Sequence, residues 1–563
     1  MCTKSWTARV FATGEAPENL AASFAAVNDP SHGPTLLVGP WLAGLHSARY
    51  EYKTRLTTTS GQLRGWYKTD RLLPYSAAVF VTFAGGGKSS KSVFNLAPAG
   101  EWTEFAVPIR RAPPETEAVI IGVGLTQHTE GQIAFAGLAV STHDLPAAYP
   151  EDPGAVTRPA PEGPLTGGDF YRIQRSGDAW WLVSPDGRPM YSTGTDGPSF
   201  RGAAAGGEMD DRMRALKFNS LAGWTALESW ADLNQRIAAN GGSPLATFRS
   251  LQTGTMDGSY DRLTEGGHAF PDPFDPRWET TLRAAVRTAA RPVKGKQWFV
   301  GFFADNEADH RDLYRHVYTP NCAGRLRAFL EKRYGDITAL NLAWGTAYAS
   351  FQDLIDGRPE PALRQGPMYE DLRLFKREIV RRYVETLVRV IREEAPGHLV
   401  FSNRFMLDDL GEWMDVIDLY QPFDAIGVNV YPANLGAGLD ASERLALELV
   451  HRKTGRPVIV TEWSIPALDS GLYSNPNTLD WSYPQAVDTQ TDRARQAARV
   501  TLDLFNLPFV IGAHWFIWSD FDSQRRQANR GLFRADGTPW VALQTAIVTA
   551  NERIEKAMEG VAR

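Results

Sequence analysis

The sequence predicts a multidomain protein in which an N-terminal β-sandwich precedes an α/β TIM (β/α)8 barrel. Two patterns and the chain length support this fold class. Between residues 33 and 140, apolar and polar side chains alternate in short runs interrupted by Gly, Pro and Ser, as in antiparallel sandwiches. From residue 190 onward, apolar runs alternate with helical patterns, which is typical of a parallel sheet built from βα units. The 563 residues are also too many for one ordinary domain.

The sandwich is predicted to occupy residues 1–150. Its strand-like runs include residues 48–53, 63–68, 78–83 and 104–107, each with period-two patterning. The last run, residues 131–140, resembles the closing strand of jelly-roll carbohydrate-binding modules. Because such modules often precede glycosidase barrels, carbohydrate binding is one hypothesis for this domain. The alternative is a docking domain that only buttresses the barrel.

A linker is predicted at residues 151–168, because residues 147–164 are rich in Pro and Gly and show little apolar periodicity. A hairpin with strands at residues 170–174 and 180–183 follows, and Asp186-Gly187 after it is a turn signal. The apolar content of this hairpin suggests that it covers the closed end of the barrel.

The barrel is predicted to occupy residues 169–563. Apolar residues at helical spacing indicate helices at residues 371–394 and 492–505. A helix or a long loop follows each candidate strand, as in a TIM barrel. The eight candidate strands are residues 190–194, 220–223, 245–248, 298–304, 399–403, 425–430, 458–461 and 509–516.

Two of these apolar runs end in a glutamate. The run at residues 298–304 continues into Asp305-Asn306-Glu307, and the run at residues 457–461 continues into Glu462-Trp463. Barrel enzymes place their chemistry at the carboxyl ends of the strands. Two carboxyl groups about 5–5.5 Å apart, one an acid/base and one a nucleophile, cleave glycosidic bonds with retention of configuration. We therefore expect Glu307 and Glu462 to face each other across the barrel mouth, although each alone could belong to a structural ion pair.

Neighbouring polar and aromatic residues fit a sugar site. The Asn306 amide can hydrogen-bond a sugar 2-hydroxyl, an interaction that strengthens in the transition state. Asn429 and Tyr431 end the sixth strand, where a phenol can hydrogen-bond the nucleophile and keep it ionised. Trp515 on the eighth strand is either a stacking platform for the sugar or a buried barrel tryptophan. The 17 Trp and 18 Tyr residues agree with sugar stacking, although aromatic residues also fill cores.

Further candidates for contact with sugar hydroxyls lie at or near the ends of other predicted strands. His514 is a candidate hydrogen-bond donor in the pocket, but a lone histidine in an apolar strand is more often a core residue. His310 is a weaker candidate for the wall of the cleft. The strand-end candidates are Asn403, Arg404, Asp196 and Trp224.

Several segments resemble glycoside hydrolase family 50, the β-agarases. They are residues 218–224 (FNSLAGW), 271–276 (PDPFDP), 301–307 (GFFADNE), 461–471 (TEWSIPALDSG) and 512–516 (GAHWF). Residues 334–346 (YGDITALNLAWGT) occur in similar form in family 42 β-galactosidases and related barrels. The resemblance covers most of residues 170–555 and, more loosely, the sandwich. Residues 308–312 are more charged than is typical of the family, and residues 519–532 match it only loosely.

The resemblance implies a retaining glycosidase in which Glu307 is the acid/base and Glu462 the nucleophile. Family 50 enzymes cleave β-1,4 links of agarose or its oligosaccharides, mostly from chain ends, and release small neoagaro-oligosaccharides. Such a mechanism needs no cofactor. One alternative is a β-galactosidase or another exo-acting β-glycosidase. A second, of another class, is a non-catalytic carbohydrate-binding protein on a decayed barrel.

Composition and motifs argue against other classes. The net charge of −6 and the pI near 6.0 give no reason to expect a nucleic-acid partner, and no stretch approaches the ~20 apolar residues of a membrane span. The ten His show no metal-ligand spacing, and Cys2 and Cys322 imply neither a disulfide framework nor a metal site. We expect a polysaccharide or oligosaccharide partner and either a cytoplasmic protein or a mature secreted or periplasmic protein. The sequence does not indicate the oligomeric state.

Overall fold

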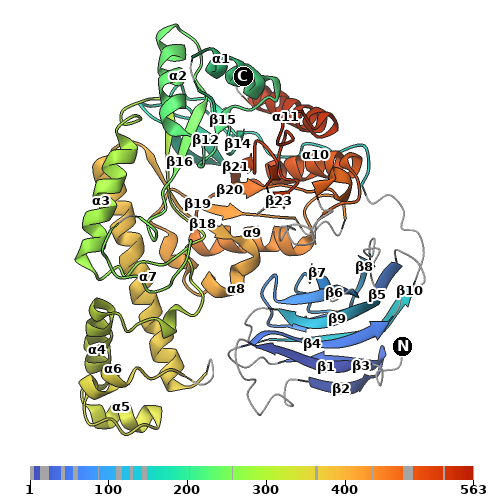
Figure 1. The fold of residues 1–563 in the computed structure, drawn as a ribbon, viewed down its shortest axis with the longest axis vertical. Helices are drawn as coiled ribbons and strands as arrows, with labels where there is room; N and C mark the ends of the chain where they lie inside the picture. Colours follow the sequence, from blue (N-terminus) through green and yellow to red (C-terminus); the bar gives the residue numbers. More distant parts are fainter. Residues whose placement is uncertain are drawn as a thin grey trace.

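The computed structural model contains an antiparallel β-sandwich and a closed (β/α)8 barrel side by side (Figure 1). Both predicted folds are therefore confirmed. Cys2 and residues 524–525 of the loop 519–532 lie outside the described residues. The structure describes residues 6–12, 24–39, 45–54, 61–85, 88–109, 117–126, 131–141, 149–201, 203–256, 258–361, 365–432, 436–472, 486–523 and 526–561.

The sandwich consists of two five-stranded antiparallel sheets, in the orders β1-β4-β9-β6-β7 and β2-β3-β10-β5-β8. Inward-facing side chains such as Val79, Ile121 and Phe135 fill the space between the sheets, because alternate residues of each strand face the partner sheet. β1 and β2 precede the alternating region seen in the sequence, so both strands were missed. The strands are β1 (Thr7–Ala12), β2 (Phe24–Asp29), β3 (Gly33–Val38), β4 (Leu45–Thr54), β5 (Gly61–Asp70), β6 (Ala77–Gly85), β7 (Lys88–Leu96), β8 (Thr103–Ile109), β9 (Ala118–Thr126) and β10 (Gln132–Ser141).

The segment after the sandwich runs along the barrel without helix or strand over residues 149–171. The Arg158 guanidinium fastens it there, because Nη1 donates to the carbonyl oxygens of Phe505 at 3.0 Å, Leu507 at 2.8 Å and Val510 at 2.9 Å. Tyr149 is buried and belongs to the barrel core. This connection is thus packed against the barrel.

The predicted hairpin covers the closed end of the barrel. β11 (Arg172–Ser176), β12 (Ala179–Val183) and β13 (Pro189–Met190) form a small antiparallel sheet. Leu182 and Tyr171 share one apolar cluster with side chains inside the barrel, including Phe248 and Phe401. Met190 was assigned to the first barrel strand, but it pairs with Leu182 in this cap sheet.

The barrel strands follow the chain order, and β21 closes onto β14 in parallel. Each of the eight predicted runs overlaps one of these strands. Gly301 permits a close approach, because a Cβ there would lie 1.9 Å from the Leu399 carbonyl oxygen of the next strand. The strands are β14 (Ser192–Thr195), β15 (Ser220–Leu221), β16 (Ala246–Ser250), β17 (Phe299–Asn306), β18 (Leu399–Met406), β19 (Ala425–Asn429), β20 (Val458–Trp463) and β21 (Val510–Trp515).

The helices surround the barrel, and the predicted helices at residues 371–394 and 492–505 lie within α7 and α10. Helices α4 to α6, inserted after β17, form a lobe beyond the ring of helices (Figure 1). The helices are α1 (Ala203–Ala215), α2 (Leu227–Ala239), α3 (Pro276–Ala290), α4 (Pro320–Tyr334), α5 (Ile337–Trp344), α6 (Phe351–Gly357), α7 (Pro367–Glu394), α8 (Leu410–Trp413), α9 (Ala441–Thr454), α10 (Gln490–Asn506) and α11 (Val541–Val561). Short elements are η3 (Leu313–Arg315), η4 (Leu407–Asp409), η5 (Ile417–Tyr420), η6 (Leu468–Ser470), β22 (Phe521–Asp522) and β23 (Gln527–Ala528).

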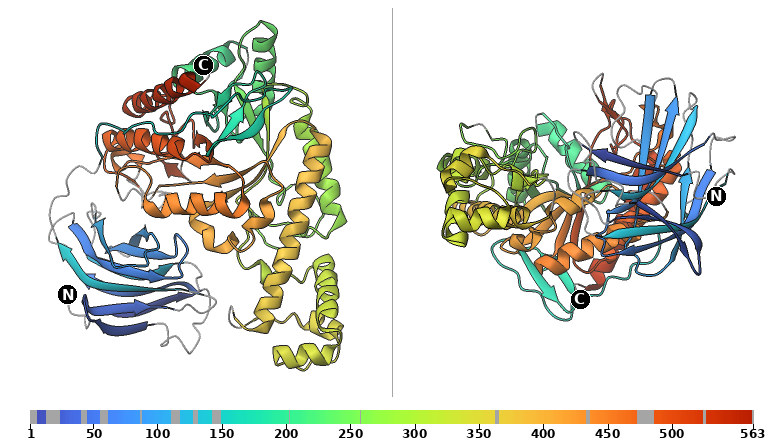
Figure 2. Two further views of the ribbon diagram at one scale, coloured as in Figure 1. Left: turned by 180° about the vertical axis from the view of Figure 1, so that it is seen from behind. Right: turned by 90° about the horizontal axis from the view of Figure 1, so that it is seen from below.

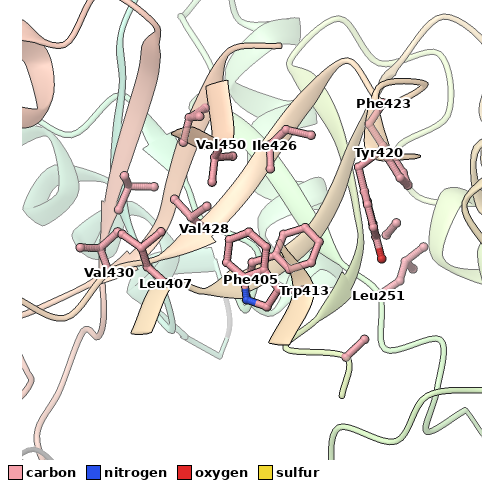
Figure 3. Packing of buried hydrophobic residues seen from close by; sticks show 14 of the residues in the cluster. Leu251, Phe405, Leu407, Trp413, Tyr420, Phe423, Ile426, Val428, Val430 and Val450 are labelled. Atoms are coloured by element: carbon pink, nitrogen blue, oxygen red, sulfur yellow. The ribbon is translucent and has the colours of Figure 1, made fainter. Parts of the chain in front are cut away.

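Apolar packing outside the strands fixes the direction of the polar side chains inside. In β19, Ile426 and Val428 pack outward in the main barrel core (Figure 3). Ala425 of the same strand belongs to the apolar cluster inside the barrel. Phe405 of β18 packs outward against Trp413 of α8, with ring centroids 4.5 Å apart. Because strand residues alternate in direction, the neighbours of these apolar residues point toward the barrel axis.

The sandwich meets the barrel beside the rim formed by the carboxyl ends of the strands. The backbone N–H of Tyr75 donates to Ser442 Oγ at 3.1 Å, and Ser442 lies in the first turn of α9, which starts at that rim. Tyr75 is 5% exposed and packs with the barrel core. The views from behind and from below also place the sandwich against this side of the barrel (Figure 2).

Candidate active site

The two predicted carboxyl groups lie at the same rim of the barrel. Glu307 follows β17 directly, and Glu462 lies near the carboxyl end of β20. β18 and β19 stand between them, and the strand register pairs Asn306 with Arg404 and Asn429 with Glu462. Four neighbouring strands thus build the centre of the site.

Glu462 is a buried carboxyl group held by three side chains. Its Oε1 accepts hydrogen bonds from Trp224 Nε1 at 2.9 Å and Arg404 Nη2 at 2.7 Å, and its Oε2 accepts from Tyr431 Oη at 2.6 Å. Burial, followed by the Glu462 charge, raises the pKa of Tyr431 well above its usual range, so the phenol keeps its proton and donates. Donors on both oxygens fix the orientation of the Glu462 side chain.

Glu307 has a more open environment, and its side chain is 20% exposed. Its Oε1 accepts from Asn429 Nδ2 at 2.7 Å, and its Oε2 lies 3.4 Å from His268 Nε2. Burial, followed by the charge of Glu462, raises the pKa of Glu307, while Asn429, His268 and Arg404 oppose the rise. A raised pKa favours the protonated form that a general acid needs.

The backbone of Glu307 is strained. Its φ is +50°, in the left-handed region that side chains other than glycine rarely adopt. Such conformations cost about 1–3 kcal/mol and cluster at functional sites. Its N–H donates to the Arg404 carbonyl oxygen at 3.0 Å, and the N–H of Ala308 donates to Asn403 Oδ1 at 3.1 Å. These bonds from β18 hold the turn that directs the Glu307 side chain into the site.

Arg404 and Asn429 connect the two carboxyl groups. Arg404 bonds Glu307 through its carbonyl oxygen and Glu462 through its guanidinium. Asn429 donates to Glu307, and its Oδ1 accepts from Thr461 Oγ1 at 2.7 Å, next to Glu462. Asn429 Nδ2 also lies 3.4 Å from Asn306 Oδ1. The two carboxyl groups are therefore near neighbours in one hydrogen-bond network.

Asp196 supports the site from beneath. It is completely buried, and its Oδ1 accepts from the backbone N–H of Trp224 at 2.8 Å. Its Oδ2 lies 3.6 Å from Arg404 Nη2. Burial, with the nearby Glu462 charge, raises the pKa of Asp196 to about 7, although Arg404 opposes the rise. Asp196 therefore orients Trp224 and Arg404 from a buried position, and its predicted contact with sugar stays a prediction.

Three other predicted sugar contacts are also inside the protein. Asn403 is 1% exposed and holds the loop after Glu307, as described above, and Arg404 is fully buried. His514 is fully buried, its Nε2 lies 2.8 Å from Ser192 Oγ, and burial lowers its pKa to about 3. The structure thus places these three side chains in the interior of the barrel, and their contact with sugar stays a prediction. A strand-end position defines a residue's place in the barrel but not the depth of its side chain.

Trp515 is 1% exposed, and its indole Nε1 donates to the Arg530 carbonyl oxygen at 2.8 Å. Its ring packs edge-on against Trp463, with centroids 4.8 Å apart. Of the two interpretations offered for Trp515, the structure favours the buried barrel tryptophan. His310 is 2% exposed and bonds to Tyr420 Oη at 2.8 Å, and burial lowers its pKa to about 4.

Two residues of the site were missed in the sequence. Asp305 Oδ2 accepts from Tyr383 Oη of α7 at 2.8 Å and from Thr253 Oγ1, and burial raises the pKa of Asp305 to about 6. His268, in the loop between β16 and α3, contacts Glu307. A cavity of about 110 Å³ adjoins both Glu307 and His268. In the sequence, only the position of Asp305 in the motif Asp305-Asn306-Glu307 indicated that it lies near the site. No pattern in the sequence indicated that His268 does.

Within the described part of the chain, no cluster of three or more His, Cys, Asp or Glu side chains is arranged to hold a metal ion. In the same residues, no helix combines the length and apolar character needed to span a membrane. Cys322 is buried in α4.

Comparison with known proteins shows that the barrel is similar to glycoside hydrolases. The family 42 β-galactosidase model matches residues 260–469. β-Agarase B of Vibrio sp. (strain JT0107) is 24% identical over 360 residues, which are 59% of this chain and 35% of the agarase. The chain thus spans about a third of the length of this curated relative.

Two solved structures share the fold over almost the whole chain. The crystal structure of an agarase superimposes with a TM-score of 0.61 at 16% identity, covering 98% of this chain and 100% of that one. The structure of an exo-β-agarase gives 0.62 at 15% identity, covering 98% and 97%. The similarity includes the sandwich as well as the barrel. These comparisons confirm the predicted resemblance to the family 50 β-agarases.

Proposed function

We propose that this protein is a retaining glycoside hydrolase that cleaves the β-1,4-galactosidic bonds of agarose or agaro-oligosaccharides from chain ends. The observation that carries the proposal is the contrast between two neighbouring carboxyl groups at one barrel rim. Glu462 accepts three hydrogen bonds and is held in place, whereas Glu307 has a raised pKa and reaches solvent. Environments that push two carboxyl groups apart in this way separate a nucleophile from an acid.

In the first step, a Glu462 oxygen attacks the anomeric carbon and forms a glycosyl ester. The bond to the leaving oxygen breaks, and this oxygen takes the proton from Glu307. In the second step, Glu307 removes a proton from water, the water oxygen attacks the anomeric carbon, and the ester bond to Glu462 breaks. Asn306, which lies beside Asn429, is positioned to hydrogen-bond the sugar 2-hydroxyl in both steps. The mechanism needs no cofactor.

Trp224 and Tyr431 surround the nucleophile and are partly exposed. The indole and the phenol therefore serve two purposes: each donates to Glu462 and presents an edge or a face to the bound sugar. Arg404 lies against the Trp224 ring, with its guanidinium carbon 5.0 Å from the ring centroid, and prevents this ring from moving inward.

The substrate is tested by incubating the protein with agarose, other marine and plant polysaccharides and nitrophenyl β-galactoside, with mass spectrometry of the products. We expect short agaro-oligosaccharides of even size to appear before long ones. Proton NMR during the first turnovers should show the β-anomer first, which is the outcome of retention. Release of the α-anomer first would contradict the mechanism, and a ladder of long products would contradict action from chain ends.

A β-galactosidase is the second candidate, because the family 42 β-galactosidase model covers β17 to β20, where both carboxyl groups lie. Rapid cleavage of nitrophenyl β-galactoside with no product from agarose would favour it. A non-catalytic sugar-binding protein, the alternative of another class, would bind an oligosaccharide in calorimetry and release no product. The presence of both glutamates argues against this third candidate.

The sandwich is proposed to bind the polysaccharide. Trp66 of β5 is 38% exposed and lies beside His32, with ring centroids 5.4 Å apart, and His32 stacks on Trp102 at 4.5 Å. Flat aromatic groups on a sheet face can stack on sugar rings. The Trp66→Ala variant should migrate faster than the wild type through an agarose-containing native gel, with unchanged hydrolysis of soluble oligosaccharides. Equal migration would favour the docking role.

A further inference from the structure

His268 is placed to act on Glu307 from a loop that belongs to neither β17 nor β20. It lies between β16 and α3, and its side chain is 46% exposed. Its Nδ1 lies 3.2 Å from the carbonyl oxygen of Asn306, and its Nε2 lies 3.4 Å from Oε2 of Glu307. The backbone N–H of Asp309 donates to the His268 carbonyl oxygen at 2.8 Å. His268 is therefore held on both sides of Glu307, by its imidazole at Asn306 and by its backbone carbonyl at Asp309.

These contacts determine where the imidazole proton is. A carbonyl oxygen only accepts, so Nδ1 carries the hydrogen that is directed at Asn306. The neutral ring then has its lone pair on Nε2, the atom that faces Glu307. The pair therefore holds one proton between Nε2 and Oε2, either on the carboxyl group beside a neutral ring or on the ring beside a carboxylate.

The other carboxyl oxygen of Glu307, Oε1, already accepts a hydrogen bond. Asn429 Nδ2 donates to Oε1 at 2.7 Å, so Oε1 acts as an acceptor and the acidic proton belongs to Oε2. The separation of 3.4 Å between Oε2 and Nε2 is longer than a strong hydrogen bond. The imidazole thus orients the proton without retaining it when a better acceptor arrives.

The charged groups near this pair come from several elements. Glu462 of β20 and Arg404 of β18 act on Glu307 from the barrel. The cavity that adjoins His268 and Glu307 is also lined by Asp309, Arg311, Asp409 and Glu412. Arg311 pairs with Asp309 at 2.9 Å, so these two charges largely cancel.

We propose that His268 is a positioning residue for Glu307: it keeps the transferable proton on Oε2 and fixes this oxygen for delivery to the leaving group. This inference rests on the proposed glycosidase function. When the glycosidic bond breaks, the proton passes from Oε2 to the leaving oxygen, and Glu307 becomes a carboxylate beside the imidazole. When water attacks the intermediate, Glu307 regains a proton on the same oxygen, and the cycle closes without a net change in His268.

The test compares leaving groups. General-acid catalysis speeds the departure of a leaving group that must be protonated. It contributes little for 2,4-dinitrophenolate, which leaves as a stable anion. The substrates are the phenyl and the 2,4-dinitrophenyl β-glycosides of the sugar unit that the wild-type protein releases. The variants are His268→Ala, His268→Gln and, as a matched control, His316→Gln at an exposed histidine after η3.

We expect His268→Ala to lower kcat/KM for the phenyl glycoside by roughly 10- to 100-fold, within the usual range of general-acid effects. The loss for the dinitrophenyl glycoside should stay within about twofold, and added imidazole should restore part of the activity because the position is open to solvent. His268→Gln keeps an N–H group near Oε2 and should lose less. It cannot become cationic, so the basic limb of its pH profile should move to higher pH, since the imidazolium lowers the pKa of Glu307.

Equal losses on both substrates would show a merely structural role and overturn the proposal, as would full activity of His268→Ala on the phenyl glycoside. Glu307→Gln measured in parallel separates this inference from the proposed function. If Glu307→Gln is fully active on the phenyl glycoside, the proposed function fails. If Glu307→Gln is impaired on that substrate while His268→Ala is not, only the inference about His268 fails.

Discussion

The surroundings of Glu462 and Glu307 differ in every respect that matters for acid–base chemistry. Glu462 is 5% exposed and is held by an indole, a guanidinium and a phenol. Glu307 is more exposed, sits on a strained turn and contacts one amide and one imidazole. The first environment fixes a charge, and the second keeps a proton available. One barrel rim can thus give two glutamates opposite properties, because the neighbouring strands supply different donors.

Removal of Glu462 should have the largest effect. The Glu462→Ala variant loses the proposed nucleophile, and we expect turnover to fall by about four orders of magnitude or more, as when other enzymes lose a nucleophile. Azide should restore part of the activity and give a glycosyl azide of inverted configuration, since it fills the space of the carboxylate. Mass spectrometry and NMR identify this product. Full turnover by a correctly folded variant would reject the assignment of Glu462.

Removal of the Glu307 proton should have the next largest effect. We expect Glu307→Gln to lower kcat/KM on poor leaving groups by about 10²- to 10⁴-fold. In the proposed mechanism the protonated form of Glu307 is the active form. Because the pKa of Glu307 lies above the ordinary 4.5, activity should persist to a higher pH than an ordinary glutamic acid would allow. The fall of kcat/KM on the basic side of the pH profile measures this pKa. A basic limb at or below 4.5 would contradict the raised pKa.

A smaller effect should come from a single donor to the nucleophile. Tyr431→Phe removes the hydrogen bond to Oε2 of Glu462, and a bond to a charged group is worth about 1.5–3 kcal/mol. We expect kcat/KM to fall roughly 10- to 100-fold while the fold is kept. Tyr67→Phe in the sandwich is the matched control, because its hydroxyl donates to the Ala97 carbonyl oxygen of that domain at 2.8 Å. If both variants lose the same activity, the donor has no special role.

The smallest expected effect is a change in the pKa of Glu307 when the charge of Glu462 is removed. Because the Glu462 charge raises the pKa of Glu307, Glu462→Gln should lower that pKa. Carbon-13 NMR titration of labelled glutamate, with Glu307→Gln for assignment, measures the change. An unchanged or higher pKa would mean that the two carboxyl groups do not interact.

The sequence predicted those features that depend on regular strands. The eight barrel strands and both glutamates were found because buried parallel strands are uninterrupted apolar runs, and the polar residues that end them stand out. Side-chain depth was not predictable in this way. Trp515 and His514 lie on a correctly predicted strand, but their burial depends on contacts with distant residues, Arg530 in one case and Ser192 in the other.

Residues in irregular segments were missed for a related reason. His268 lies in a long loop without periodicity, so only the folded chain brings it to Glu307. β1 and β2 were missed because their short segments precede the clearly alternating region. Arg158, within the predicted linker, binds three barrel carbonyl groups, an interaction that no local pattern could reveal.

Arg404 joins both glutamates to a single residue, since its carbonyl oxygen holds the turn at Glu307 while its guanidinium holds Glu462. In a glycosidase the gap between the two carboxyl groups decides the stereochemistry of the product. Here Arg404 of β18, rather than a loop, connects the two carboxyl groups. In the proposed mechanism, the loops after the strands can therefore vary and change the sugar that is accepted, while the spacing of the carboxyl groups is kept.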